Sequence, residues 1–140
     1  MAEKIAVSID INAPPGKVWS ALTEPAQVRK YMMGATLKTD WQVGHPITWS
    51  GEARGKAYED KGKVLAVDPP EHLSVTHWSP LSGLADEPQN YHTVSYDLAP
   101  TSGGTRVTLT QENLTGVSAE QSKQNWRPVL DGLKQTVEAA

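Results

Sequence analysis

The chain has 140 residues, of which 38% are hydrophobic and 21% charged, and it contains no cysteine. This length and composition are typical of one globular domain, expected to span residues 1–140, and they exclude a disordered chain. Thirteen basic and 16 acidic residues give a net charge of -3, which argues against nucleic acid as a partner. Without cysteine there is no disulfide framework and no thiolate metal site, and we expect a cytoplasmic protein. No apolar run reaches the roughly 20 residues that a membrane span needs.

The first part of the chain predicts a strand followed by two short helices. Apolar and polar residues alternate over Ile5–Ile11, which indicates a half-buried strand. The Pro-Pro pair at 14–15 ends this strand, and a short helix that carries Trp19 follows. Pro25 ends that helix, and a second short helix is predicted over Val28–Met32.

The middle of the chain predicts an antiparallel run of strands, separated by turn-forming residues. Apolar residues recur at every second position in most of these segments, which is the pattern of a sheet with one buried face. The predicted strands are Ala35–Trp41, Pro46–Ser50, Lys56–Val67, Glu71–Trp78, Tyr91–Leu98 and Thr105–Glu112.

The chain ends in one long predicted helix. Ser118 and Gln121 form a capping-box pattern, which places the start of the helix at about Ser118 and its end near Glu138. Apolar residues then recur at helical spacing on one stripe. An antiparallel sheet must have its buried face covered, and this helix is the element long enough to do so. The order of elements therefore predicts an α+β fold.

Four segments in this order resemble the START-like helix-grip superfamily (SRPBCC), and within it the family of the activator of heat shock protein 90 ATPase. They are INAPPGKVWSALTEPAQVRKYM, GKVLAVDPPEHLSVTHW, GGTRVTLTQENL and NWRPVLDGLKQTVE. The resemblance implies a curved antiparallel sheet of six or seven strands wrapped around a long C-terminal helix, with two short helices after the first strand. It also implies an apolar cavity between the sheet and that helix.

The expected wall of this cavity is mostly apolar and aromatic. The candidate residues are Trp19, Tyr31, Met32, Trp49, Val75, Val94, Tyr96, Trp126, Leu130 and Leu133. The alternative is that these side chains pack against one another as a filled core, which is the usual role of regularly spaced apolar residues. Tyr31 and Trp126 are the preferred candidates for lining open space, because each side chain needs a polar partner for its tip.

His77 and His92 are candidate polar residues of the same cavity. If their strands pair as a simple hairpin, the two residues are cross-strand neighbours with Cβ atoms roughly 5 Å apart. Together with Gln111 they could grip a polar ligand group, move a proton, or form a hydrogen-bonded pair in the core. Two histidines without a third carboxylate ligand are a weak basis for a metal site, so no metal or other cofactor is predicted. Asp60 and the other acidic residues are expected on solvated surfaces.

These observations predict a protein that binds an apolar or amphipathic small molecule without catalysis. The family resemblance leaves open a co-chaperone that interacts with heat shock protein 90 in the stress response. A third hypothesis is a cyclase/dehydrase-type enzyme that uses His77, His92 or Tyr96 as acid or base. The sequence allows either a monomer or a homodimer.

Overall fold

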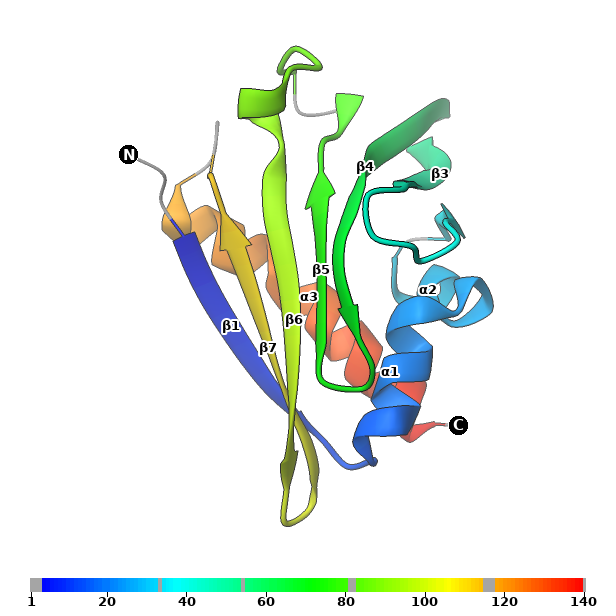
Figure 1. Cartoon of the computed structure of the whole chain (residues 1–140), viewed down its shortest axis with the longest axis vertical. Helices are drawn as coiled ribbons and strands as arrows, with labels where there is room; N and C mark the ends of the chain where they lie inside the picture. Colours follow the sequence, from blue (N-terminus) through cyan, green and yellow to red (C-terminus); the bar gives the residue numbers. More distant parts are fainter. Residues whose placement is uncertain (1–3, 33, 54, 81–82, 115–117, 140) are drawn as a thin grey trace.

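The computed structural model describes residues 4–32, 34–53, 55–80, 83–114 and 118–139. Within these residues the strands are β1 (Lys4–Ile11), β2 (Thr36–Lys38), β3 (Pro46–Ala53), β4 (Lys56–Asp68), β5 (His72–His77), β6 (His92–Thr101) and β7 (Gly104–Glu112). They form one seven-stranded antiparallel sheet in the order β1-β7-β6-β5-β4-β3-β2 (Figure 1). The helices are α1 (Pro15–Thr23), α2 (Pro25–Tyr31) and α3 (Ala119–Glu138), and a short 3-10 turn, η2, spans Pro88–Asn90. The predicted helix-grip fold is confirmed.

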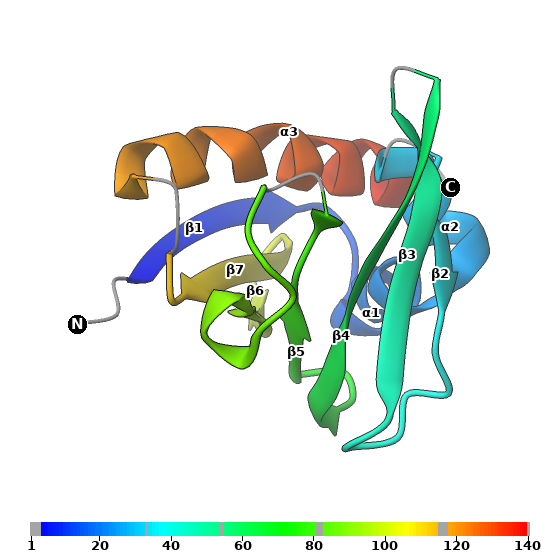
Figure 2. The same ribbon diagram turned by 90° about the horizontal axis from the view of Figure 1, so that it is seen from above.

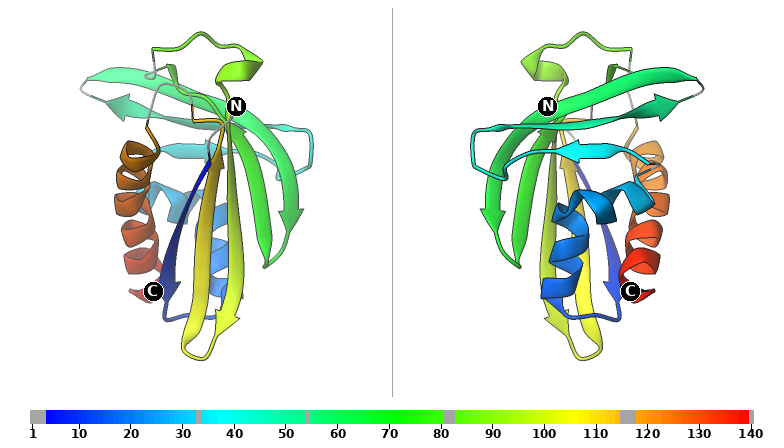
Figure 3. Two further views of the ribbon diagram at one scale, coloured as in Figure 1. Left: turned by 90° about the vertical axis from the view of Figure 1, so that its left-hand side faces the viewer. Right: turned by 90° about the vertical axis from the view of Figure 1, so that its right-hand side faces the viewer.

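All three α-helices lie on the same side of the sheet (Figure 3). Seen from above, the sheet curves from β1, which runs beside α3, round to β3 and β2 near α2 (Figure 2). The Ser118 side chain accepts a hydrogen bond from the Gln121 amide at 3.1 Å, as the capping pattern predicts. No helix among the described ranges is both long and apolar enough to cross a membrane.

The curvature of the sheet comes from β4. The second half of this 13-residue strand pairs with β5, whereas its first half pairs with β3. Within the pairing of β4 with β5, the register shifts between Val64 and Ala66, and Leu65 lies at the surface. Such a bulge bends a strand and increases its local twist. As a result β3 and β4 arch over the helical side of the sheet, as Figure 3 shows.

The predicted strand Ala35–Trp41 is too long, because β2 ends at Lys38. Polar side chains turn the backbone directly after it. Thr39 Oγ1 accepts from the Trp41 amide at 3.1 Å, and Asp40 Oδ1 accepts from the Gln42 amide at 3.0 Å. Trp41 adopts a positive φ of 58°. Local bonds of this kind compete with the strand ladder, and here they favour a turn.

Candidate functional site

A cavity of about 420 Å³ lies between the sheet, α2, β2 and the first half of α3. Most of the predicted cavity residues line it. They are Tyr31, Met32, Trp49, Val75, His77, His92, Val94, Tyr96, Gln111 and Trp126. Tyr31, Val75, Val94 and Tyr96 also belong to the packed core, and whether these residues bind a ligand stays a prediction.

Trp19, Leu130 and Leu133 do not line the cavity, contrary to the sequence-based expectation. Leu130 and Leu133 are 1% exposed and belong to the packed core. Gly132, which lies between them on α3, faces Tyr31 of α2, and both leucines belong to one core cluster with residues of α1 and α2. Trp19 is half-buried at the edge of that core. The apolar stripe of α3 thus packs in a filled core towards the C-terminal end of the helix and lines an open cavity towards its N-terminal end.

Two informative residues of the wall were not predicted. Trp41 reaches the cavity from the turn after β2, and its indole Nε1 donates to the Thr23 carbonyl at 3.1 Å. Asp60 lies on β4 among residues that were expected to be solvated, yet its side chain is only 17% exposed and lines the cavity. The signal for Asp60 was its even spacing from the buried Val64, which places both side chains on one face of a strand.

Polar and aromatic side chains form a row across four strands at one end of the cavity. The register pairs Trp49 on β3 with Asp60 on β4, and His77 on β5 with His92 on β6. His77 Nε2 donates to Asp60 Oδ2 at 2.9 Å. The Trp49 and His77 rings are T-shaped, with their centroids 5.2 Å apart. The two imidazoles stack with centroids 6.5 Å apart. The predicted pairing of the histidines is confirmed, and a carboxylate that was not predicted joins them.

His92 is held in one protonation and tautomeric state. Its Nδ1 lies 2.6 Å from the Asn113 carbonyl oxygen, which can only accept, so Nδ1 carries the proton. Burial lowers the pKa of His92, the Asn113 carbonyl opposes this shift, and the charge of His77 adds to it. His92 is therefore neutral near pH 7, and its Nε2 is a hydrogen-bond acceptor.

Gln111 on β7 lies beside Val94 of β6 and connects the sheet to α3 across the cavity. Its Oε1 accepts from Ser122 Oγ at 2.8 Å and from Trp126 Nε1 at 2.5 Å. The Tyr31 hydroxyl donates to the Ala21 carbonyl at 2.7 Å. These contacts supply the polar partners that the sequence analysis required for Trp126 and Tyr31. Burial raises the pKa of both Tyr31 and Tyr96, so neither phenol is a base near neutral pH.

The state of His92 predicts a specific sensitivity to acid. Since its folded-state pKa is lowered, the unfolded chain takes up a proton there more readily than the folded chain does. Stability should be complete above the unfolded-state value of about 6.5 and should fall as the pH drops below it. Urea midpoints measured from pH 8 to pH 5 should therefore decline less for His92→Gln than for the wild type. Val43→Ala, at a valine that is 63% exposed, is the control and should keep the wild-type decline. Equal declines for His92→Gln and wild type would contradict the burial of a neutral ring.

The chain matches known proteins over nearly its whole length. The family model described as Activator of Hsp90 ATPase homolog 1-like protein matches residues 12–138. The solution structure of ChR145 from Cytophaga hutchinsonii is 42% identical, with a TM-score of 0.83 over 98% of this chain and 94% of that chain. The AHSA1-like protein from Aeromonas hydrophila is 23% identical, with a TM-score of 0.82 over 98% of this chain and 93% of that chain.

CV1439 from Chromobacterium violaceum is 24% identical, with a TM-score of 0.81 over 96% of each chain. At this level of identity it and the Aeromonas protein show the fold alone. A search among curated proteins gives no match. The family model covers well over half of the chain, and the fold and the four quoted segments agree with it. The chain therefore belongs to the family of Activator of Hsp90 ATPase homolog 1-like proteins, within the START-like superfamily.

Proposed function

We propose that this protein is a cytoplasmic binding protein that holds an apolar or amphipathic small molecule in the cavity between the sheet and α3. The observation that supports this most is the cavity itself, whose volume of about 420 Å³ lies within the range of small-molecule sites. Its wall is largely apolar and aromatic, with polar groups gathered at Gln111 and along the row from Trp49 to His92. An apolar lining with few, well-placed polar groups is typical of such sites.

Binding can be followed with the protein's own tryptophans, because Trp41, Trp49 and Trp126 line the cavity. A panel of lipids, flavonoids and polyketides should contain compounds that change this fluorescence and raise the melting temperature. A ligand at 100 times its Kd adds about 2.7 kcal/mol to the free energy of unfolding. If no compound of the panel affects either signal, the proposal fails.

Filling the cavity should abolish binding. Val94 lies on β6, is 3% exposed and lines the cavity, so the added ring of Val94→Phe must occupy ligand space. We expect the Kd of any panel ligand to rise by at least about tenfold, a loss of about 1.4 kcal/mol. Val43→Phe, at a valine that is 63% exposed, is the matched control and should bind as the wild type does. A folded Val94→Phe variant with unchanged affinity would place the ligand elsewhere.

An acid–base enzyme is the second candidate, and one observation favours it. Asp60 accepts from His77 Nε2 and so orients the imidazole, as the orienting carboxylate does in a general-base pair. If the protein transforms a polyketide of the panel, His77→Gln should stop product formation while leaving binding in place. We rank this below binding because Tyr31 and Tyr96 are held neutral and His92 already donates to Asn113.

A chaperone-binding role has less support. Among the described residues, the large apolar side chains that are exposed are Val43 and Leu65. Two side chains fall short of the area of roughly 1,000 Å² or more that a specific protein interface buries. An interaction with heat shock protein 90 stays a prediction from the family.

A further inference from the structure

We propose that the end of the cavity formed by Asp60, His77 and His92 selects an uncharged ligand that terminates in a hydroxyl group and rejects one that terminates in a carboxylate. We call these three residues the acceptor end. This inference rests on the proposed binding function and adds the chemistry of the group that the site recognises.

Both histidines of the acceptor end already use a ring N–H within the protein. His77 Nε2 donates to Asp60, and His92 Nδ1 donates to the Asn113 carbonyl. Neutral imidazole has one donor and one acceptor nitrogen, so Nε2 of the neutral His92 ring can only accept. Among the described residues, no hydrogen bond to His92 Nε2 accompanies the one made by its Nδ1. A ligand hydroxyl can donate to such a nitrogen, whereas a carboxylate has no proton to donate.

Several N–H and O–H groups of the wall are used by the protein as well. The Tyr31 hydroxyl donates to Ala21, and the Trp41 indole donates to Thr23. Ser122 and Trp126 both donate to Gln111 Oε1. These four donors are thus not available to neutralise a ligand carboxylate, which needs several hydrogen bonds or a cation when it leaves water.

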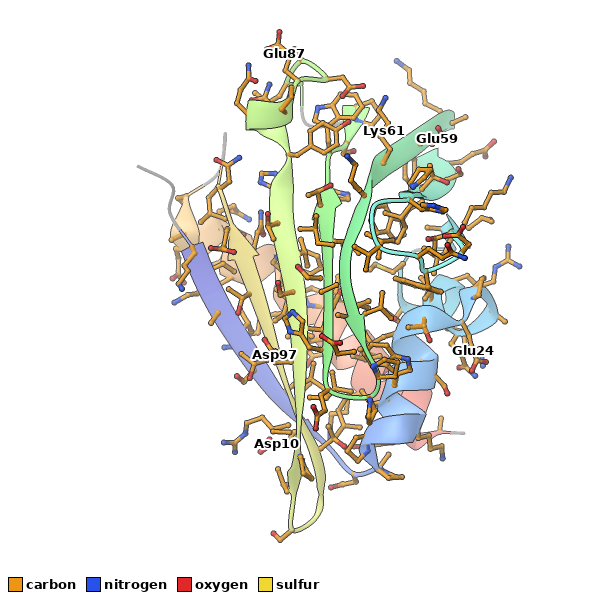
Figure 4. All side chains as sticks on the ribbon, viewed as in Figure 1. Asp10, Glu24, Glu59, Lys61, Glu87 and Asp97 are labelled. Carbon is orange, nitrogen blue, oxygen red and sulfur yellow. The ribbon has the colours of Figure 1, made fainter. Side chains whose placement is uncertain are left out.

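The charges at the acceptor end also oppose an anion. No lysine or arginine is among the described residues that line the cavity, and Asp60 supplies a formal negative charge there. Asp60 Oδ1 is buried without a hydrogen-bond partner in the described structure, while Oδ2 accepts from His77. Lys61, the next residue along β4 (labelled in Figure 4), pairs with Asp86, and its Nζ lies 5.7 Å from the centroid of the Trp78 ring. Lys61 is not among the residues that line the cavity. A second carboxylate beside Asp60 would meet like charge in a poorly solvated site.

The rest of the cavity near this end suits an apolar body. Trp49 packs against His77 in a T-shaped contact, and Val75 and Val94 lie one inward-facing position further along β5 and β6. A ligand with an apolar ring system can therefore lie along these strands and bring a terminal hydroxyl to the histidines. A fused aromatic ring with one hydroxyl is the simplest probe of this arrangement.

The test compares naphthalene, 2-naphthol and 2-naphthoate by isothermal titration calorimetry at neutral pH. These probes share one ring system and differ only in the terminal group. We expect 2-naphthol to bind about fivefold to tenfold more tightly than naphthalene, which corresponds to one net hydrogen bond. We expect 2-naphthoate to bind at least about tenfold more weakly than 2-naphthol.

Two variants then assign the selectivity to the acceptor end. Asp60→Asn removes the negative charge and supplies an N–H donor, so the ratio between the Kd values of 2-naphthoate and 2-naphthol should shrink about tenfold. His92→Phe removes the acceptor nitrogen and should abolish the advantage of 2-naphthol over naphthalene. The controls are Asp97→Asn and His72→Phe, which change the exposed Asp97–His72 pair and should leave all three Kd values unchanged (Figure 4).

The outcomes separate this inference from the function on which it rests. Equal binding of 2-naphthol and 2-naphthoate by the wild type would overturn the inference while the binding function stands, and this comparison needs no variant. A folded Asp60→Asn protein that keeps the wild-type selectivity would also overturn it. If none of the three probes binds, naphthalene included, the proposed binding function fails as well.

Discussion

Replacing Leu130 by alanine should lower the free energy of unfolding by about 3 kcal/mol, within the usual range for a buried leucine. Leu130 is 1% exposed and lies in the part of α3 that packs against the filled core. Removing its side chain leaves a void that the surrounding strands and helices cannot close. The measurement is urea denaturation followed by far-ultraviolet circular dichroism, with the unfolding slope checked for change.

The neighbouring Val129 provides the matched control. Val129 is only partly buried and lines the cavity, so its side chain already borders open space. Val129→Ala should therefore cost no more than the transfer of the lost methyl groups, about 1 kcal/mol. A cost below about 1 kcal/mol for Leu130→Ala, or equal costs for both variants, would mean that the boundary between core and cavity on α3 is misplaced.

Segments with strong periodicity were predicted well, because periodicity reports directly on which face of an element is buried. Strand β1 alternates in the sequence and in its burial, and α3 begins at the predicted cap. The segment after α2 was predicted less well. Its apolar residues continue to Trp41, but the side chains of Thr39 and Asp40 bond to the backbone and end the strand early. The sequence alone does not show whether the apolar pattern, which favours a strand, or the side-chain bonds of Thr39 and Asp40, which favour a turn, will dominate.

The candidate site was predicted in part for the same reason. His77 and His92 each lie two residues from an inward-facing apolar residue of the same strand, which places both side chains on the inner face of the sheet. Their strands are joined by one loop that is symmetric between them, which predicts that the two residues pair. Asp60 was missed because it stands between Glu59 and Lys61, where the local composition indicates a solvated strand. The contact of Asp60 with His77 on β5 depends on the bend of β4, and this bend arises from the packing of the strands rather than from the local sequence. Where the cavity ends along α3 also depends on where α1 and α2 pack. The apolar stripe of α3 alone therefore could not show that Trp126 lines the cavity whereas Leu130 lies in the packed core.

The bend that brings Asp60 to His77 depends on Gly62, and Gly62→Ala should cost about 3 kcal/mol, at the upper end of the usual range for overpacking. Gly62 lies between the Lys61–Trp78 bridge and the Val64–Val75 pair, where β4 and β5 approach without a regular ladder. A Cβ atom on Gly62 would collide with the backbone carbonyl oxygen of Thr76. Because the obstacle is backbone, β4 must move away from β5 to relieve it.

Gly51→Ala on the adjacent strand β3 is the control for this substitution. A Cβ atom there meets the tip of the Tyr58 side chain at 2.9 Å, and a side chain can rotate away where a backbone carbonyl cannot. Both variants lose the same glycine freedom in the unfolded state, so the difference between their unfolding free energies isolates the contact between β4 and β5. Separation of these strands should also lengthen the Asp60–His77 hydrogen bond, which the imidazole nitrogen shifts of His77 report directly. If Gly62→Ala is as stable as Gly51→Ala and leaves those shifts unchanged, the close approach of β4 to β5 does not position the acceptor end.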